Sequence, residues 1–386
     1  MNLSTMTRMR QTGLSLVELM IAMAIGLLLM LGVIQIFIAS QAASRLSEGV
    51  ARVQENGRFA LDFLERDVRM AGHMGCVNDQ GHIVRGLGSP RISTGAAAGS
   101  GSPLDFNVSV QGYEAPGTGP GATLVAGGGS VPANLPAAIA GLVPAPMPGS
   151  DILVLRFLAP EGVPVTNVTA TTLTVEQLKW SRLTENGVPT PTLFGVADCG
   201  TAEVFRGTTA AAGTVTATGA DLSRFVASPL APTMVYRADS LVYYVGLNAA
   251  TQQPGLRRAR AGSAGTYTIN EELVEGVENM QLLYGQDTAV NISKASLPLG
   301  NITTQKTASA LTTQTNAAGA AEWLRVGQVQ VALVLRSPGA ATVSQAEATS
   351  ELGALGMKYD ANASRDGRYR TTYEASIALR NRLFGN

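Results

Sequence analysis

Residues 14 to 39 read LSLVELMIAMAIGLLLMLGVIQIFIA. From Leu19 to Ala39 the only polar side chain is Gln35, and at about 1.5 Å per residue a helix of this length crosses the hydrocarbon core of a bilayer. The preceding leader carries Arg8 and Arg10 and no acidic residue, so the positive-inside rule keeps the leader in the cytoplasm. We therefore predict a membrane helix followed by an extracytoplasmic head.

This segment differs from a secretory signal peptide in two ways. Ser40-Gln41-Ala42 offers a loose small-x-small cleavage site, but the apolar run is longer than the roughly 7 to 15 residues of a signal peptide. Glu18 also places a carboxylate at the start of the run, where it costs on the order of a few kcal/mol unless it is paired. We therefore predict a partner for Glu18, with extension of its side chain to the membrane interface as the simpler alternative.

The residues around Glu18 resemble a known processing site. Gly13-Leu14-Ser15-Leu16-Val17-Glu18 is similar to the prepilin peptidase site of type IV pilin-like proteins, in which cleavage follows the glycine. The resemblance implies a cleaved cytoplasmic leader at 1–13 and N-methylation of Leu14, a position commonly occupied by phenylalanine in major pilins. It also implies that Glu18 pairs with the Leu14 amine of a neighbouring subunit and so sets the register of assembly.

The helix is predicted to continue beyond the membrane as an amphipathic segment. Residues with apolar or no side chains recur at steps of three and four, while charged residues occupy other faces. No proline precedes Pro90, so residues 14 to 71 are expected to form one helix of roughly 85 Å, with Gly72 as its cap and its internal glycines as weak points. We divide it into a transmembrane half at 14–39 and a periplasmic half at 40–72. The recurring residues are Leu46, Val50, Val53, Gly57, Leu61, Leu64, Val68 and Ala71.

The amphipathic segment carries a second resemblance. RVQENGRFAL at 52–61, RDVRMAG at 66–72 and the pair Gly75-Cys76 are similar to the PilW branch of minor pilins. A weaker likeness to PilW proteins and J-type pseudopilins is found at 272–284, 329–338 and 377–381.

This resemblance implies a minor pilin of the type IV pilus that joins other minor pilins to prime assembly and presents an adhesin at the pilus tip. The implied partners are other minor pilins, the major pilin, the prepilin peptidase, the inner-membrane assembly platform and a large tip adhesin. The chain would cross the inner membrane once, with a periplasmic head, and reach the cell surface after assembly. Whether the pilus serves twitching motility, adhesion or DNA uptake stays open.

We predict an α+β fold, in which the long helix packs on an antiparallel β-sheet head (73–386) with long Gly/Ala/Pro/Thr-rich loops. In 328–336 apolar residues alternate with Gln328, Gln330 and Arg336, which predicts a half-buried strand. Loops or insertions are expected at 86–150, 207–220, 289–320 and 339–366. The predicted strands are Ile152–Leu158, Thr172–Val175, Ala202–Phe205, Leu241–Val245, Gln328–Leu335 and Thr371–Leu379.

The chain contains two cysteines, Cys76 and Cys199. They are too few for a disulfide scaffold and lack the close Cys/His spacing of a zinc site. In the cytosol they would be two small buried side chains. Because the head is predicted to be exported, we predict a Cys76–Cys199 disulfide, which contributes about 4 to 5 kcal/mol on the chain-entropy estimate.

The sequence offers little for catalysis or nucleic-acid binding. Basic and acidic residues both number 28, so no basic field would gather nucleic acid. His73 and His82 are the only histidines, and no phosphate loop or GxSxG turn is present. We predict no enzyme activity, cofactor, metal site or small-molecule substrate. The basic run at 256–260 is interpreted as a solvated strand edge, and Glu272, Glu275 and Glu278 as a solvated turn.

Two other functions stay open. A J-type minor pseudopilin of a type II secretion system would use the same scaffold for protein export. A membrane-anchored periplasmic binding domain would keep its function after loss of Glu18.

Overall fold

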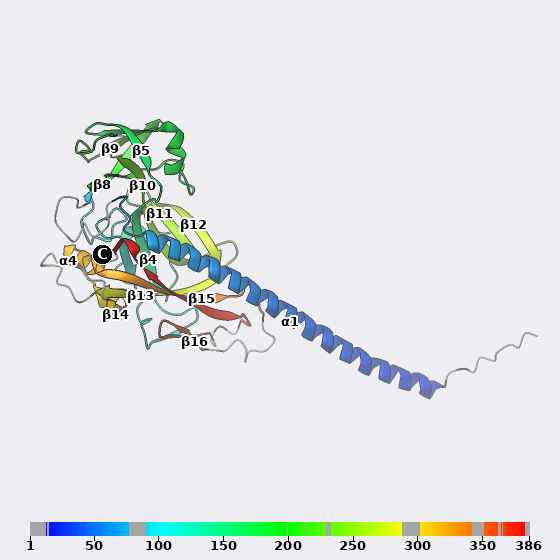
Figure 1. Ribbon diagram of the computed structural model, residues 1–386. Coiled ribbons are helices and arrows are strands. Elements are labelled where there is room, and N and C mark those ends of the chain that lie inside the picture. The colour runs from blue at the N-terminus through cyan, green and yellow to red at the C-terminus, as the bar shows by residue number, and fades with distance from the viewer. Residues whose placement is uncertain are drawn as a thin grey trace, which may run out of the picture.

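The computed structural model describes residues 13, 15–76, 90–198, 200–211, 213–228, 233–287, 302–341, 351–361, 364 and 366–382. One long helix, α1 (Leu16–Met70), projects from a β-rich head that covers only its second half (Figure 1). Helix α1 begins after Ser15, and the chain turns away after Ala71 at Gly72, whose φ of 77° suits a residue without a side chain. The predicted α+β class and the long amino-terminal helix are confirmed.

The largest sheet has eleven strands and is organised around β10 (Met234–Leu247). The second half of β10 lies between β4 (Ile152–Leu158) and β11 (Pro254–Ala261). Its first residues pair instead with β5 (Val163–Val168) and β7 (Leu193–Asp198). The other strands are β1 (Arg91–Ser93), β2 (Val110–Tyr113), β6 (Thr172–Val175), β8 (Thr201–Ala211), β9 (Thr214–Thr218) and β12 (Tyr267–Glu275).

Strands β5 to β9 build a lobe, which also includes the 3-10 helix η2 (Gln177–Leu183) and forms the upper part of the head in Figure 1. This lobe has its own apolar core, in which Phe194 and Phe205 stack with ring centroids 6.1 Å apart. Because β10 belongs to both the lobe and the main sheet, the two parts of the head share a continuous strand.

A second sheet of four strands lies beneath α1. Its order is β14 (Ile302–Lys306), β13 (Val277–Asp287), β15 (Val326–Arg336) and β18 (Arg370–Ala378). A small sheet of β16 (Glu351–Ala354), β17 (Met357–Asp360) and β3 (Thr123–Val125) completes the β-structure. The short helices are α2 (Ala137–Ala140), α3 (Ala308–Leu311), α4 (Ala317–Leu324) and the 3-10 helix η4 (Arg380–Arg382).

All six predicted strands occur in the structure, but the interpretation of 328–336 as half-buried is only partly right. Val329, Val331, Leu333 and Leu335 belong to the main core, which also contains the buried residues of α1. Ala332 and Val334 on the opposite face are buried as well, because the small sheet covers them.

Three segments expected to be loops contain regular structure. Residues 207–220 hold most of the β8–β9 hairpin, which turns at Gly213. The described part of 289–320 contains β14, α3 and the start of α4, and that of 339–366 contains β16 and β17. In 86–150 the described residues form only short strands and α2, as expected. Residues 288–301 and 342–350 lie outside the described residues.

The basic run at 256–260 is not a solvated edge, because β11 lies between β10 and β12. Arg257 pairs with Glu272 at 3.0 Å, and Arg260 pairs with the buried Asp239. The interpretation of the acidic residues as a solvated turn also fails for Glu278. Its buried carboxylate pairs with Arg336 at 3.0 Å and with Arg370 at 2.7 Å.

Candidate assembly interface

The amino-terminal half of α1 is exposed along its whole length. Every residue from 15 to 41 is exposed, including large apolar side chains such as Leu16 and Phe37. By length and composition α1 is able to cross a membrane. Such an apolar surface needs either lipid or other apolar helices around it.

The predicted processing site lies at the start of this helix. Gly13 is exposed, and no atom lies within 4 Å of the place where its side chain would be. Leu14 lies outside the described residues. Glu18 is exposed and accepts a hydrogen bond from the Ser15 backbone N–H at 3.0 Å, while Ser15 Oγ caps the helix in return.

Glu18 therefore occupies helix position N3 of a capping box, a local role in addition to the predicted one in assembly. The Ser-x-x-Glu spacing at 15 to 18 was the available signal. Cleavage, N-methylation and the register role of Glu18 stay predictions.

The head begins to cover α1 at Gly49, the first buried residue of the helix. A methyl group at position 49 would lie 2.9 Å from Ala341 Cβ, and one at position 57 would lie 2.5 Å from Tyr373 Cε2. These two glycines, interpreted from the sequence as weak points, are places where the head approaches the helix backbone most closely. We call the contact surface from Gly49 to Ala71 the helix seat.

A buried carboxylate fixes the rotation of α1 in the helix seat. Asp67 accepts hydrogen bonds from Tyr243 Oη at 2.5 Å and from Arg258 Nη1 at 2.9 Å, and Arg258 also pairs with Glu271 at 2.7 Å. Burial, together with the neighbouring Asp67, raises the pKa of Tyr243 well above its usual value, so its hydroxyl stays a donor. Asp67 lies on the apolar stripe between Leu64 and Ala71, and a carboxylate at such a position was an overlooked signal.

Two asparagines bind α1 to the head through backbone groups. Asn56 Nδ2 donates to the Glu275 carbonyl at 3.0 Å. Asn381 Nδ2 lies within hydrogen-bonding distance of the Arg69, Met70 and Ala71 carbonyls, at 3.2, 3.4 and 3.2 Å. The last carbonyls of a helix lack partners within the helix, so Asn381 closes its end.

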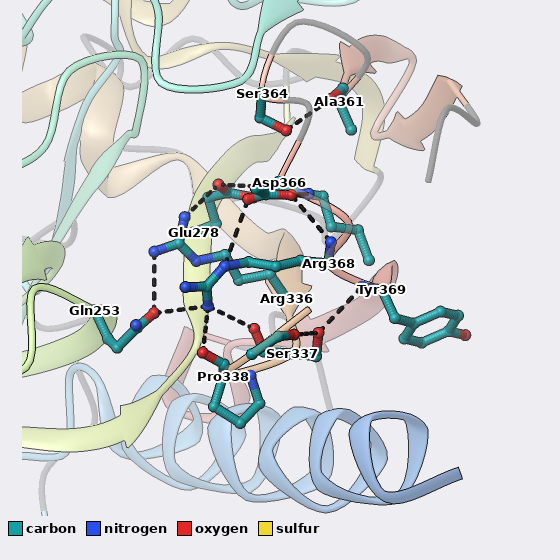
Figure 2. A network of polar contacts seen from close by, with 12 residues as sticks. Gln253, Glu278, Arg336, Ser337, Pro338, Ala361, Ser364, Asp366, Arg368 and Tyr369 are labelled. Carbon is teal, nitrogen blue, oxygen red and sulfur yellow. Dashed lines mark hydrogen bonds and ion pairs between the residues drawn. The ribbon is translucent and has the colours of Figure 1, made fainter. Parts of the chain in front are cut away.

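A network of charged residues lies where α1 leaves the head (Figure 2). Arg368 Nη1 donates to the Ser337 carbonyl at 2.8 Å and to the Pro338 carbonyl at 2.6 Å. Arg370 joins Glu278 to Asp366, with bonds of 2.8 Å to each oxygen of Asp366. The network therefore holds the turn that begins at Ser337, which contacts Gly49.

Of the two cysteines in the predicted disulfide, Cys76 is described, whereas Cys199 lies outside the described residues. The neighbouring residues are close together: a side chain at Gly75 would lie 2.9 Å from Ala197 Cβ. The bridge stays a prediction.

The described histidine and acidic residues form no recognisable reaction centre. His73 Nδ1 lies 2.8 Å from the Leu158 carbonyl, and burial lowers its pKa. His82 lies outside the described residues. Within the described part of the chain, no group of three His, Cys, Asp or Glu side chains is placed to hold a metal ion.

Comparison with protein families gives two matches. Residues 242–381 match the family described as type IV pilus-assembly protein W, and residues 8–34 match the prokaryotic N-terminal methylation motif. Together the two matches support a PilW-type pilin with a prepilin leader. No curated protein and no solved structure matches the chain.

The PilW-matched region of the chain supplies contacts of the helix seat. It contains Tyr243, Arg258, Glu275, Tyr373 and Asn381, each of which contacts the helix. The three weaker resemblances at 272–284, 329–338 and 377–381 also lie within it, whereas 52–76 lies outside both matched stretches.

The matches support a type IV pilus-related pilin, from structural protein families that are not known as enzymes. The exposed apolar helix and the methylation motif fit a membrane-anchored pilus protein. A match to a pilus-assembly family supports interaction with other pilus components.

Proposed function

We propose that this pilin joins other minor pilins to prime type IV pilus assembly and then sits at the pilus tip, where it presents an adhesin. The supporting observation is the division of α1. One face of its second half is buried in the helix seat, whereas the apolar residues from 16 to 38 have no cover in the single chain. Lipid covers this half before assembly, and the helices of neighbouring pilins cover it afterwards.

The amino terminus supplies the register of this assembly. Cleavage after Gly13 frees the Leu14 amine beside the apolar run, and Glu18 of one subunit pairs with that amine on its neighbour. A charge at the start of an apolar run is costly when unpaired, so only registers that bring the two charges together are stable. In the unpaired subunit the Ser15 backbone N–H donates a hydrogen bond to the Glu18 carboxylate.

The form of the head supports the proposed tip position. The lobe of β5 to β9 adds bulk outside the PilW-matched region. A tip subunit has neighbours on one side only, so a large head there does not obstruct the repeated packing of a shaft. Before assembly the head lies in the periplasm. The partners are the prepilin peptidase, the assembly platform, other minor pilins, the major pilin and the adhesin.

The test is complementation of a piliated strain that lacks its own copy of this subunit. Glu18→Ala is expected to be inserted and cut, giving N-methyl-Leu14 by mass spectrometry, but to leave few or no sheared pili. Glu48→Gln is the matched control, because Glu48 is an exposed acid of the same helix outside the apolar run. It should restore piliation.

Three results would contradict parts of the proposal. Normal piliation with Glu18→Ala would remove the register role. Immunogold label spread evenly along sheared filaments would remove the tip position. Normal pili with a defect in protein secretion in the deletion strain would indicate the J-type pseudopilin function instead.

A further inference from the structure

A cleft of about 280 Å³ opens beside α4, at the end of the head opposite the projecting half of α1 (Figure 1). One wall is the end of β2 with the residues that follow it, 111–117. The other wall is α3 with the loop 312–315, and Ala133 and Asn134 also line the cleft. The volume is near the lower end of the range for small-ligand sites, about 300 Å³.

The first wall is held in place by a fully buried arginine. Arg156 donates hydrogen bonds to the carbonyls of Val108 and Ser102, at 2.7 and 2.9 Å, and to Gln111 Oε1 at 3.3 Å. Because a guanidinium can only donate, it holds the Gln111 oxygen on its own side. The Gln111 amide NH₂ has no hydrogen-bond partner among the described residues and is left as a donor in the lining of the cleft.

The second wall is joined to the first by a carboxylate. Glu114 Oε2 accepts from the Ser309 backbone N–H at 3.2 Å and from the Ser309 hydroxyl at the start of α3. No described residue donates to Glu114 Oε1, which is therefore an available acceptor. The Gln111 amide and the Glu114 carboxylate are thus held in the lining of the cleft before any ligand arrives, which lowers the entropic cost of binding.

The remaining lining identifies the chemistry that the cleft favours. Among the described residues that line the cleft, Glu114 is the only charged one and none is Lys, Arg or His, so phosphates and other anions find no counter-charge there. One carboxylate is too few for a metal site. Trp323 is 3% exposed and packs edge-on against Tyr284 at 4.9 Å, so an apolar ligand finds no open aromatic surface. The exposed side chains of Thr313, Gln314 and Thr315 add hydroxyl and amide groups.

We propose that this cleft binds a neutral saccharide. Sugar hydroxyls both donate and accept hydrogen bonds at close spacing, which suits a lining of amide, hydroxyl and single carboxylate groups. The pilin would then contact a glycan directly with a part of its head that lies away from the projecting half of α1. This inference concerns a binding site of the head and does not depend on the proposed role in assembly.

The test uses the full chain in phosphatidylcholine nanodiscs, prepared without sugar-based detergents. Glucose, galactose, N-acetylglucosamine and lactose are the neutral probes, and N-acetylneuraminic acid is the anionic one. Titration calorimetry and saturation-transfer NMR should show saturable binding of at least one neutral probe, with a Kd of about 0.1 to 10 mM. The anionic probe should bind at least fivefold more weakly.

Variants locate the binding in the cleft. Glu114→Gln and Thr313→Val should each weaken binding of the neutral probe about fivefold or more. Thr171→Val, an exposed threonine on the β5–β6 turn, is the matched control and should bind as the wild type does. If Glu114→Gln fails to fold, Thr313→Val decides, because the Thr313 side chain is exposed and forms no hydrogen bond with the described residues of the head.

The proposal is overturned if no neutral probe saturates. It is equally overturned if Thr313→Val binds with wild-type affinity, or if the anionic probe binds as tightly as the neutral ones.

Discussion

At the scale of single residues, two glycines of α1 have opposite roles. Gly26 has no atom within 4 Å of its missing side chain, whereas Gly57 has the ring of Tyr373 at 2.5 Å. An alanine is worth about 1 kcal/mol more than glycine inside a helix. At Gly57 that gain competes with a collision, so the same substitution has different consequences at the two positions.

Gly57→Ala is therefore expected to destabilise the head by about 1 to 2 kcal/mol, because Tyr373 must move away from the helix. Gly26→Ala is the matched control and should leave the unfolding of the head unchanged. Urea unfolding of the full chain in nanodiscs, followed by tryptophan fluorescence, measures both.

The partner variant Tyr373→Ala should remove most of the penalty of Gly57→Ala in a double-mutant cycle. Equal costs for Gly57→Ala with and without Tyr373 would show that the collision is not the cause.

Asp67 shows which part of a buried ion pair can be predicted from the sequence and which part cannot. Its place on the apolar stripe of α1 signals a buried carboxylate that needs a partner. Its partners Tyr243 and Arg258 lie 176 and 191 residues away in the chain. No local pattern connects positions so far apart, so this tertiary pairing could not be predicted from the sequence.

At the scale of elements, apolar periodicity predicted α1 and the six strands, since both have strong patterns. It failed where strands are rich in threonine and alanine. In β9 only Val215 and Ala217 face the lobe core, and a composition of Thr, Ala and Gly resembled a loop. Threonine is β-branched and suits strands, so the alternation of apolar and polar residues predicts this strand better than the composition of the segment does.

The charged network beside α1 makes the stability of the head depend on pH through Asp366. Burial alone would raise the pKa of Asp366, but hydrogen bonds from Arg370 and from the Arg368 backbone lower it to about 2. A carboxyl whose pKa is lower in the folded state stabilises the fold above its unfolded pKa. That contribution is lost as the pH falls from about 4 to about 2.

Asp366→Asn should accordingly reduce the melting temperature at pH 7 and flatten its decline between pH 4 and pH 2. Asp62→Asn, a change at an exposed acid of α1, should do neither. Melting curves of the three proteins across that pH range make the comparison. If the melting temperature of Asp366→Asn falls with pH as steeply as that of the wild type, other carboxyl groups cause the acid sensitivity.

At the scale of the whole molecule, the head has two parts with different relations to α1. The PilW-matched region holds the helix, whereas the lobe of β5 to β9 is joined through β10. The predicted disulfide would connect them a second time, because Cys76 follows α1 and Cys199 lies between β7 and β8.

Removing that bridge with Cys76→Ser and Cys199→Ser should lower the stability of the head by about 4 to 5 kcal/mol on the chain-entropy estimate. Denaturant unfolding of the double variant and the wild type, expressed and purified in the same way without reducing agent, measures the difference. The bridge is wrong if both thiols of unreduced wild-type protein react with an alkylating reagent after unfolding.

The helix seat also determines how the molecule carries force. It runs lengthwise along α1 from Gly49 to Ala71, over roughly 33 Å, and the helix then stands free for about 15 Å before residue 39. A force that pulls the head along the axis of α1 loads the helix seat in shear. The contacts of Gly57, Asn56 and Asp67 are then strained together rather than peeled apart in turn, and the free stretch below Gly49 is where bending under a sideways load is concentrated.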